Sequence, residues 1–242
     1  MASKTIRTHK TTGAGYYKPE NIEYFKQALN DAREAIRGGA RLRVSVSAKN
    51  RKMGDVASVS VLPFITCPAR CAKTCGASCY AAKIALLYKN TLKAYARNTA
   101  LLIETPGEFW RQVEAAIMGA RFFRLNVSGD ILNADYFKNA CEIAARQSHC
   151  KILMFTKRYE IVNAYIKNGG EIPENLRVIF SAWEGLKPIN PYKLPESSVI
   201  MPDAETIPQN WKICGGNCFE CFAAGAGCLG LKTGETVAFH LH

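Results

Sequence analysis

The stretch Val56-Ala-Ser-Val-Ser-Val-Leu62, followed by Cys67-Pro-Ala-Arg-Cys71-Ala-Lys-Thr-Cys75-Gly-Ala-Ser-Cys79-Tyr80, decides the fold expected of this chain. The first part is a short, mainly apolar run of the kind that forms a buried strand. In the second part, four of the ten cysteines fall within thirteen residues, with three residues between neighbours. A helical pattern over residues 81–103 comes next. Four thiols in a loop between a strand and a helix predict a metal centre, because thiolates are soft ligands for zinc and iron–sulfur clusters.

The region beyond this loop alternates between short apolar runs and helical patterns. We predict strands at 122–127, 151–155, 177–180, 198–201 and 235–241, and helices at 106–118, 134–147 and 159–167. Before the loop, the pattern predicts a helix at 21–37 and a strand at 42–46. Alternation of strands and helices is typical of βαβ units, so we expect an α/β fold with a mainly parallel sheet.

Polar residues follow several of the predicted strands at the point where each strand ends. They are Cys67, Ser128-Gly129-Asp130, Thr156-Lys157 and Ser181-Ala182-Trp183. The carboxyl ends of parallel strands meet at one edge of a sheet, where active sites of α/β folds and barrels gather. The sequence therefore predicts a site at this edge. The alternative is that each group forms an ordinary turn, with Asp130 as a helix N-cap.

A second set of cysteines has the spacing Cys214-x3-Cys218-x2-Cys221-x6-Cys228. Four thiolates at such spacing fit a zinc site or a 4Fe–4S cluster. The basic N-terminus lacks an apolar signal segment and no run of eighteen apolar residues occurs, so we expect a cytoplasmic protein without a membrane span. Thiols stay reduced in the cytoplasm, which favours metal binding over the alternative of disulfides in both sets.

The net charge of +12 is unevenly distributed. Residues 1–100 contain 18 Lys and Arg against 5 Asp and Glu, a balance of +13, and the remaining residues contain 14 against 15. A one-sided basic balance predicts a nucleic-acid partner; the alternative is a solvated basic surface. The predicted contacts are Arg41, Arg43, Lys49, Arg51 and Lys52, together with Lys89, Lys93 and Arg97 on one helix stripe.

The strand that ends in Cys67-x3-Cys71, with the later pair Cys79-Tyr80, resembles the radical S-adenosylmethionine enzymes. This resemblance implies a partial (β/α) barrel of about six mainly parallel strands over residues 55–205. A basic N-terminal extension would cover 1–54, and a cysteine-rich metal-binding segment would cover 206–242. The family's cysteine spacing is usually three and then two residues. Here it is three throughout, so Cys67 and Cys71 would ligate with either Cys75 or Cys79.

The resemblance also implies a 4Fe–4S cluster in the 67–79 loop and S-adenosylmethionine beside it. Ser128-Gly129-Asp130 stands where such enzymes have the Gly-Gly-Glu-like segment that holds the methionine amine. The implied cofactor-binding residues are Tyr80, Asn126, Ser128, Gly129, Asp130, Thr156, Lys157, Ser181 and Trp183. The second cysteine set would hold a second cluster, with zinc as the alternative.

Over most of its length the chain looks like the phage gene product 88 family, which would place it in the cytoplasm of a host cell. The matching segments are Asn50-Arg-Lys-Met-Gly54, Thr66-Cys-Pro, Cys79-Tyr-Ala81, Phe123-Arg-Leu-Asn-Val-Ser-Gly-Asp130, Phe155-Thr-Lys157, Phe180-Ser-Ala-Trp183 and Cys214-Gly-Gly-Asn-Cys218.

Three functional hypotheses remain open at this point. The first is an iron–sulfur enzyme that cleaves S-adenosylmethionine and acts on a nucleic acid or nucleotide. The second is a non-catalytic nucleic-acid-binding protein stabilised by zinc or iron–sulfur clusters. The third is an electron-transfer or redox-sensing protein with two fully ligated clusters. The first requires one iron without a cysteine ligand, so the number of ligating thiols in the 67–79 loop distinguishes it from the other two.

Overall fold

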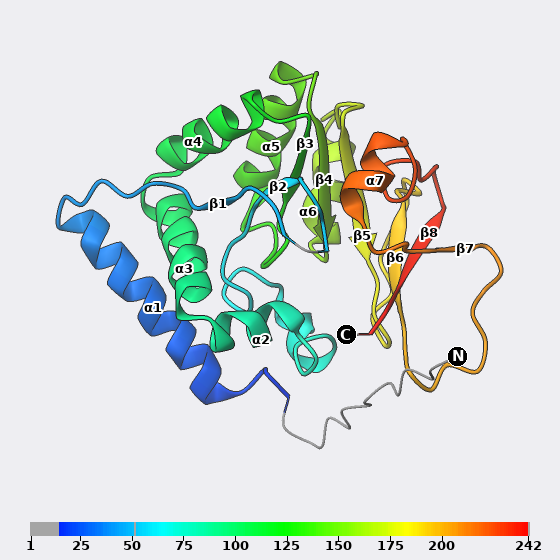
Figure 1. The fold of residues 1–242 in the computed structure, drawn as a ribbon, viewed down its shortest axis with the longest axis horizontal. Helices are drawn as coiled ribbons and strands as arrows, with labels where there is room; N and C mark the ends of the chain where they lie inside the picture. The colour runs from blue at the N-terminus through cyan, green and yellow to red at the C-terminus, as the bar shows by residue number, and fades with distance from the viewer. Residues whose placement is uncertain (1–14, 51, 242) are drawn as a thin grey trace, which may run out of the picture.

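The structure, a computed structural model, describes residues 15–50 and 52–241, which form one unit around a single sheet (Figure 1). The eight described strands lie in the order β1 (Val46–Ser47), β2 (Ala57–Val59), β3 (Phe122–Leu125), β4 (Lys151–Thr156), β5 (Leu176–Ser181), β6 (Glu196–Ile200), β8 (Thr236–His240) and β7 (Trp211–Ile213). All neighbours pair in parallel except β1 and β2. The predicted mainly parallel α/β fold is therefore confirmed.

The sheet is open, with β1 and β7 at its two edges. The structure confirms the predicted parallel sheet, whose strands follow one another in near-sequential order. It does not confirm that this sheet curves into a partial barrel. Of the eight described strands, only β7 has no counterpart among the predicted strands, because its three residues are too few to show a period. A metal-binding role for residues 206–242 stays a prediction.

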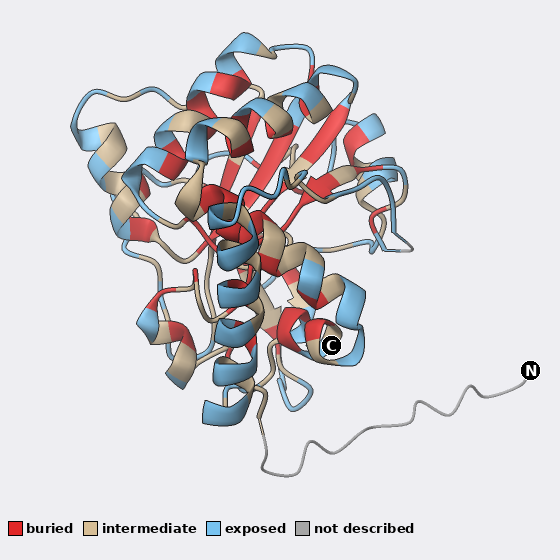
Figure 2. Cartoon of the chain, turned by 90° about the vertical axis from the view of Figure 1, so that its left-hand side faces the viewer, coloured by how far each residue is buried: buried red, intermediate tan, exposed pale blue. Residues whose placement is uncertain are grey.

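Helices cover one face of the sheet. They are α3 (Lys89–Glu104), α4 (Pro106–Met118), α5 (Ala134–Arg146) and α6 (Tyr159–Lys167). The helix α2 (Tyr80–Leu87) packs against α3 instead. Sequential parallel strands joined by right-handed crossovers place their helices on the same side. The core against these helices contains alternate strand residues, such as Leu125, Met154 and Val178, which lie level with one another. Figure 2 shows the strands mostly buried, in red, and the outer surfaces of the helices in pale blue.

Intervening strand residues point to the opposite face because side chains alternate along a strand. Leu153 and Ile179 belong there to a second core that contains Phe222 of α7 (Cys218–Ala223). Arg124 lies between Phe123 and Leu125, which pack on the helix side, so it also faces this second side. The two faces of the sheet thus differ: one is packed by helices, and the other carries the site.

The pattern over residues 81–103 is not one helix. Tyr88 is extended, with φ −121° and ψ 100°, so α2 ends at Leu87 and α3 begins at Lys89. The predicted strand at 42–46 is also shorter, because side chains of neighbouring helices bind its backbone instead of a second strand. The Val44 N–H donates to Gln112 Oε1 (2.8 Å), and the Ser45 N–H donates to Asn98 Oδ1 (2.7 Å).

The helix α1 (Pro19–Arg37) packs along α3, with Phe25 and Leu29 against Ala96 and Ala100. Glu104 at the end of α3 accepts hydrogen bonds from Arg33 and Arg37, and these hold its pKa below the usual range. Residues 1–14 of the predicted N-terminal extension lie outside the described residues. Among the described helices, none is both long enough and apolar enough to cross a bilayer.

The buried side chain of Asn98 connects the N-terminal segment to the sheet by hydrogen bonds, and we expect its removal to lower the stability of the chain. Its Nδ2 donates to Ser45 O and Ser60 O, both at 2.9 Å, and its side chain is 1% exposed. Asn98→Ala leaves these backbone groups without partners, so the free energy of unfolding should fall by about 1–3 kcal/mol. Urea unfolding measures this, with the exposed Asn90→Ala in the same helix as the control. An equal loss of unfolding free energy in both variants would show that the hydrogen bonds of Asn98 do not stabilise the chain.

Candidate functional site

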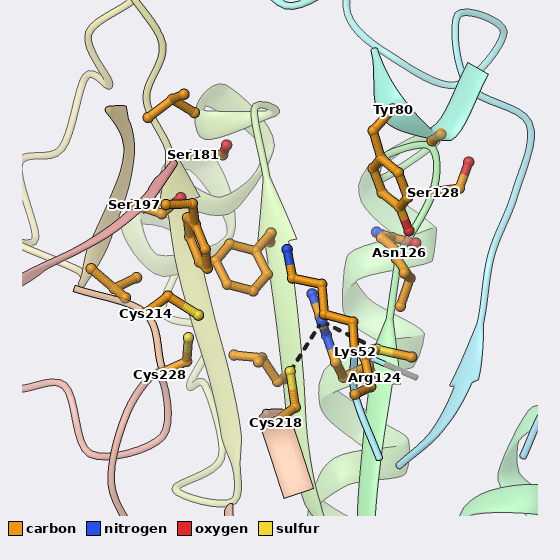
Figure 3. A pocket seen from close by; sticks show the side chains of 18 of the residues that line it. Lys52, Tyr80, Arg124, Asn126, Ser128, Ser181, Ser197, Cys214, Cys218 and Cys228 are labelled. Carbon is orange, nitrogen blue, oxygen red and sulfur yellow. Dashed lines mark hydrogen bonds between the residues drawn. The ribbon is translucent and has the colours of Figure 1, made fainter. Parts of the chain in front are cut away.

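A cavity of about 670 Å³ lies on the face of the sheet away from α3–α6 (Figure 3). Its walls include the ends of β3, β4 and β5, the 67–79 loop and the segment around α7. All eight clustered cysteines line it: Cys67, Cys71, Cys75, Cys79, Cys214, Cys218, Cys221 and Cys228. Two cysteine sets that are far apart in the sequence therefore share one space.

The first cysteine set is held by a tightly folded loop. The 3-10 helix η1 (Ala69–Lys73) contains Cys71, which is 3% exposed, and the Gly76 N–H donates to Cys71 O at 2.8 Å. A Cβ on Gly76 would lie 2.7 Å from Cys71 O, so only glycine allows this closure. The loop is also tied to α6, because Arg70 forms an ion pair with Glu160.

The thiols of this loop influence one another. A hydrogen bond with the Cys67 thiol, more than burial, raises the pKa of Cys71 to about 12. A hydrogen bond with Cys71 and then burial raise the pKa of Cys75 as well. For Cys79 the largest cause of its raised pKa is burial, and Cys75 adds only a charge effect. Cys71 thus lies between Cys67 and Cys75, and it does not influence Cys79 in this way.

Lys157, which follows β4, is a cation that acts on this loop from outside it. Its ammonium lowers the pKa of Cys71, Cys75 and Cys79, against the larger effects that raise them. The Lys157 Nζ donates to Ser181 Oγ at 2.8 Å and lies 6.0 Å from the centre of the Trp183 ring. The strand ends of β4 and β5 therefore place a positive charge beside the first cysteine set.

Asp130 is buried at the edge of the sheet, where it connects the segment after β3 to the end of β4 by hydrogen bonds. It is 4% exposed, and its Oδ1 accepts from Thr156 Oγ1 (2.5 Å) and from the Ile131 N–H (2.8 Å). Its Oδ2 accepts from the Lys157 N–H (2.8 Å). Burial raises the pKa of Asp130 in spite of these bonds. The N-cap of α5 is Asn133, so the alternative role of Asp130 as a helix N-cap is excluded.

The second cysteine set surrounds α7. Asn217 caps this helix, and the Cys214 N–H donates to Ala238 O of β8 at 2.9 Å. Gly227 has φ +56°, and a Cβ there would lie 2.8 Å from Cys221 Sγ, so glycine leaves room for the thiol. Burial raises the pKa of Cys228 to about 12, and the Arg124 guanidinium opposes this shift.

The Asn50–Gly54 turn holds α7 in place. Met53 is buried in the same core as Phe222 and Cys228, and its carbonyl accepts from the Phe219 N–H at 2.9 Å. Gly54 has φ +67°, and a Cβ there would lie 2.8 Å from Phe219 Cβ. This basic turn therefore positions the second cysteine set.

The sequence model of one family, described as gene product 88, matches residues 25–235. The chain belongs to the gene product 88 family. The matched region contains both cysteine sets, the Asn50–Gly54 turn and the strand ends that line the cavity. Comparison with curated proteins found no match, and comparison with solved structures found none. The predicted family is confirmed, whereas the likeness of the loop to radical S-adenosylmethionine enzymes stays a prediction.

In this gene product 88 protein, the cavity brings together every residue predicted to bind the cofactor. These are Tyr80, Asn126, Ser128, Gly129, Asp130, Thr156, Lys157, Ser181 and Trp183. Of the predicted nucleic-acid contacts, Lys52 lines the cavity and Arg51 lies outside the described residues. Arg41, Arg43, Lys49, Lys89 and Lys93 are exposed elsewhere, and the half-buried Arg97 donates to Ser45 Oγ at 3.3 Å.

Arg124 is the residue of the site that sequence reasoning missed. Its guanidinium lies 5.2 Å from the centre of the Phe155 ring, and its Nη1 donates to Met53 Sδ (3.2 Å) and Cys218 Sγ (3.5 Å). The signal was present: an arginine interrupts the apolar run Phe122-Phe-Arg-Leu125, and such a charge in a buried strand points to a site.

Within residues 15–50 and 52–241, no three His, Cys, Asp or Glu side chains are grouped so that they could hold one metal ion. A single zinc ion requires four ligands around one point. The donor set itself fits a 4Fe–4S cluster better, because a cubane takes four thiolates from cysteines and each binds a separate iron. Metal binding at both sets stays a prediction.

Gly129 sets the distance between β3 and the first cysteine loop. It has φ +75°, and a Cβ there would lie 2.5 Å from Val61 Cγ2 and 2.6 Å from Thr66 Oγ1. Gly185 has a similar φ of +71° but open space around it. We expect Gly185→Ala to cost about 1 kcal/mol of unfolding free energy from backbone strain alone. Gly129→Ala should cost about 2 kcal/mol more, because overpacking is added. Equal losses in urea unfolding would show that the contact is unimportant.

Proposed function

We propose that this chain is an iron–sulfur enzyme that resembles radical S-adenosylmethionine enzymes and acts on a nucleic acid or nucleotide. One observation carries the proposal: both cysteine sets and all nine residues predicted to bind the cofactor line a single cavity of about 670 Å³. A purely structural metal site does not need a cavity lined with hydroxyl, amide and ammonium groups. A volume of this size lies within the range of ligand-binding pockets.

When bound with one iron free of cysteine, a 4Fe–4S cluster supplies the electron that cleaves S-adenosylmethionine. In this chain, Cys67, Cys71 and Cys75 would hold that cluster, because the Cys71 thiol is the neighbour of both Cys67 and Cys75. Cys79 would be the spare thiol, since its contact with the other three is weaker. Gly76 packs closely against Cys71 O, and this contact keeps the loop that contains the three cysteines tightly folded.

The residues of the strand ends would position the cofactor. Lys157 places its ammonium beside the loop and is oriented by Ser181. The Asp130 carboxylate already accepts three hydrogen bonds, so its role is to fix Thr156 and the Lys157 backbone. It would not hold the methionine amine in the way a Gly-Gly-Glu-like segment does.

The test is the metal content of protein reconstituted without air, followed by electron paramagnetic resonance and a 5′-deoxyadenosine assay. The proposal expects about eight irons per chain, as two 4Fe–4S clusters require. It also expects a spectrum that changes when S-adenosylmethionine is added, together with release of 5′-deoxyadenosine. Zinc without iron contradicts it. Two clusters with an unchanged spectrum would favour the electron-transfer alternative.

A nucleic-acid partner is supported by the exposure of Arg41, Arg43, Lys49, Lys89 and Lys93. Each phosphate contact lowers the slope of log K against log salt concentration by about 0.9 for duplex DNA. We therefore expect a Lys89→Gln/Lys93→Gln double variant to bind DNA more weakly, with a slope shallower by about 2. Fluorescence anisotropy at several salt concentrations measures this slope. Lys212→Gln is the control, because Lys212 pairs with Glu235 and is not a predicted nucleic-acid contact. An affinity for DNA that does not change with salt concentration contradicts the proposed nucleic-acid partner.

A further inference from the structure

Arg124 of β3 and Asn126, which follows this strand, each carry an N–H donor without an acceptor at the wall of the cavity. Arg124 Nε and Asn126 Nδ2 are both buried and have no hydrogen-bond partner among the described residues. Asn126 is 5% exposed, and its Oδ1 accepts from the Tyr136 hydroxyl at 2.6 Å, which fixes the amide in place. Residues two apart share one face of a strand, and Figure 3 shows both side chains beside the cavity.

Unpartnered buried donors destabilise the folded chain, because each has lost its hydrogen bonds to water without gaining others. Arg124 is not relieved by an ion pair, since no carboxylate of the described chain lies within ion-pairing distance of it. Its Nη1 faces two sulfur atoms, which are weak acceptors. The stacking on Phe155 fixes the plane of the guanidinium and leaves its Nε edge without an acceptor.

The charge of the lining favours an anion. Its basic members are Lys52, Arg124, Lys157 and Lys212, and its single carboxylate among the described residues is Asp130. That carboxylate is already engaged by Thr156, Ile131 and Lys157. Lys212 pairs with an acid outside the lining, Glu235, at 2.7 Å.

We propose that Arg124 and Asn126 bind an oxyanion group of the substrate, either a phosphate or a carboxylate. Arginine binds both through parallel N–H donors, and an amide adds a donor to a second oxygen. Arg124 lies beside Cys218, whereas Lys157 and Ser181 lie beside the 67–79 loop. The substrate is thus anchored next to the second cysteine set and extends toward the first. Only the assignment of this anion to a substrate rests on the proposed function.

The test is calorimetric titration of the full chain, purified without air, with inorganic phosphate and separately with acetate at constant ionic strength. The wild-type chain should bind at least one of them, and the tighter one identifies the chemistry of the substrate group. Arg124→Gln should weaken this binding at least tenfold. Arg111→Gln is the control, because it removes an exposed arginine that lies outside the lining and already pairs with Glu108, and it should bind as the wild type does.

Circular dichroism shows whether each variant is folded. If Arg124→Gln is unfolded, Arg124→Lys decides, because it keeps the charge but loses the planar fork and should still weaken binding several-fold. Absence of binding to both probes, or equal affinity of the wild type and the folded Arg124 variant, overturns the proposal. The titration contains neither S-adenosylmethionine nor a reductant. A chain that binds phosphate but releases no 5′-deoxyadenosine would therefore refute the proposed enzyme and leave this site standing.

Discussion

Cys71→Ser removes the iron of the first cysteine set, whereas Cys79→Ser leaves it in place. We expect about four irons per chain in the Cys71 variant and about eight in the Cys79 variant after reconstitution without air, because each 4Fe–4S cluster contributes four. The physical reason is contact: the Cys71 thiol is hydrogen-bonded to its neighbours Cys67 and Cys75, while Cys79 is set apart at the start of α2.

The same pair of variants separates an open cluster from a saturated one. If Cys79 is spare, its serine variant should keep a spectrum that responds to S-adenosylmethionine. If Cys79→Ser instead loses four irons, Cys79 is a ligand, and Cys75→Ser decides whether the cluster is saturated. Loss of four irons in both variants means that all four thiols ligate, which contradicts an enzyme with an open iron. Cys141→Ser is a matched control, because Cys141 is a core thiol far from the cavity lining and should not change the iron content.

Asp130→Ala should lower the free energy of unfolding by about 3 kcal/mol or more, the largest loss expected of any single change at the cavity. It leaves the Ile131 and Lys157 amides and the Thr156 hydroxyl without their common acceptor at a site that is 4% exposed. Urea unfolding of the metal-free chain measures this. Asp135→Ala is the control, because Asp135 is exposed in the first turn of α5.

The pH dependence gives a second measurement on Asp130. Burial raises the pKa of its carboxyl above the ordinary value of an aspartate, so the protonated form is favoured more in the folded than in the unfolded chain. Its contribution is therefore complete below the unfolded pKa and is lost as the pH rises through the folded pKa. Asp130→Asn cannot titrate, so the stability of the wild type relative to this variant should increase as the pH falls from neutral. A constant difference contradicts a raised pKa.

Several features of the site were predictable because local chemistry fixes them. The even spacing of Cys67, Cys71, Cys75 and Cys79 indicates one loop, and parallel strands necessarily bring Asp130, Thr156 and Ser181 to one edge. The structure places all of these around the cavity. Their roles toward a cofactor stay predictions, since positions alone do not reveal what binds.

Other features depend on contacts between distant segments and could not be predicted. Nothing in the spacing of Cys214–Cys228 says that this set faces the first one, because that depends on Met53 holding α7. The backbone at Val44 and Ser45 looks like a strand, yet Gln112 and Asn98 bind it. The extended residue Tyr88 has neither proline nor glycine beside it to mark the end of α2.

The position of β8 has a consequence for the order in which the chain is completed on the ribosome. The strands β2 to β6 can pair in the order in which they are made, but β8 lies between β6 and β7 although β7 precedes it in the chain. The strand β7 therefore has no partner until residues 236–240 have emerged. Because Cys214 is anchored to Ala238 of that last strand, the second cysteine set closes over the cavity late. The 67–79 loop is therefore complete before the segment on the other side of the cavity is anchored.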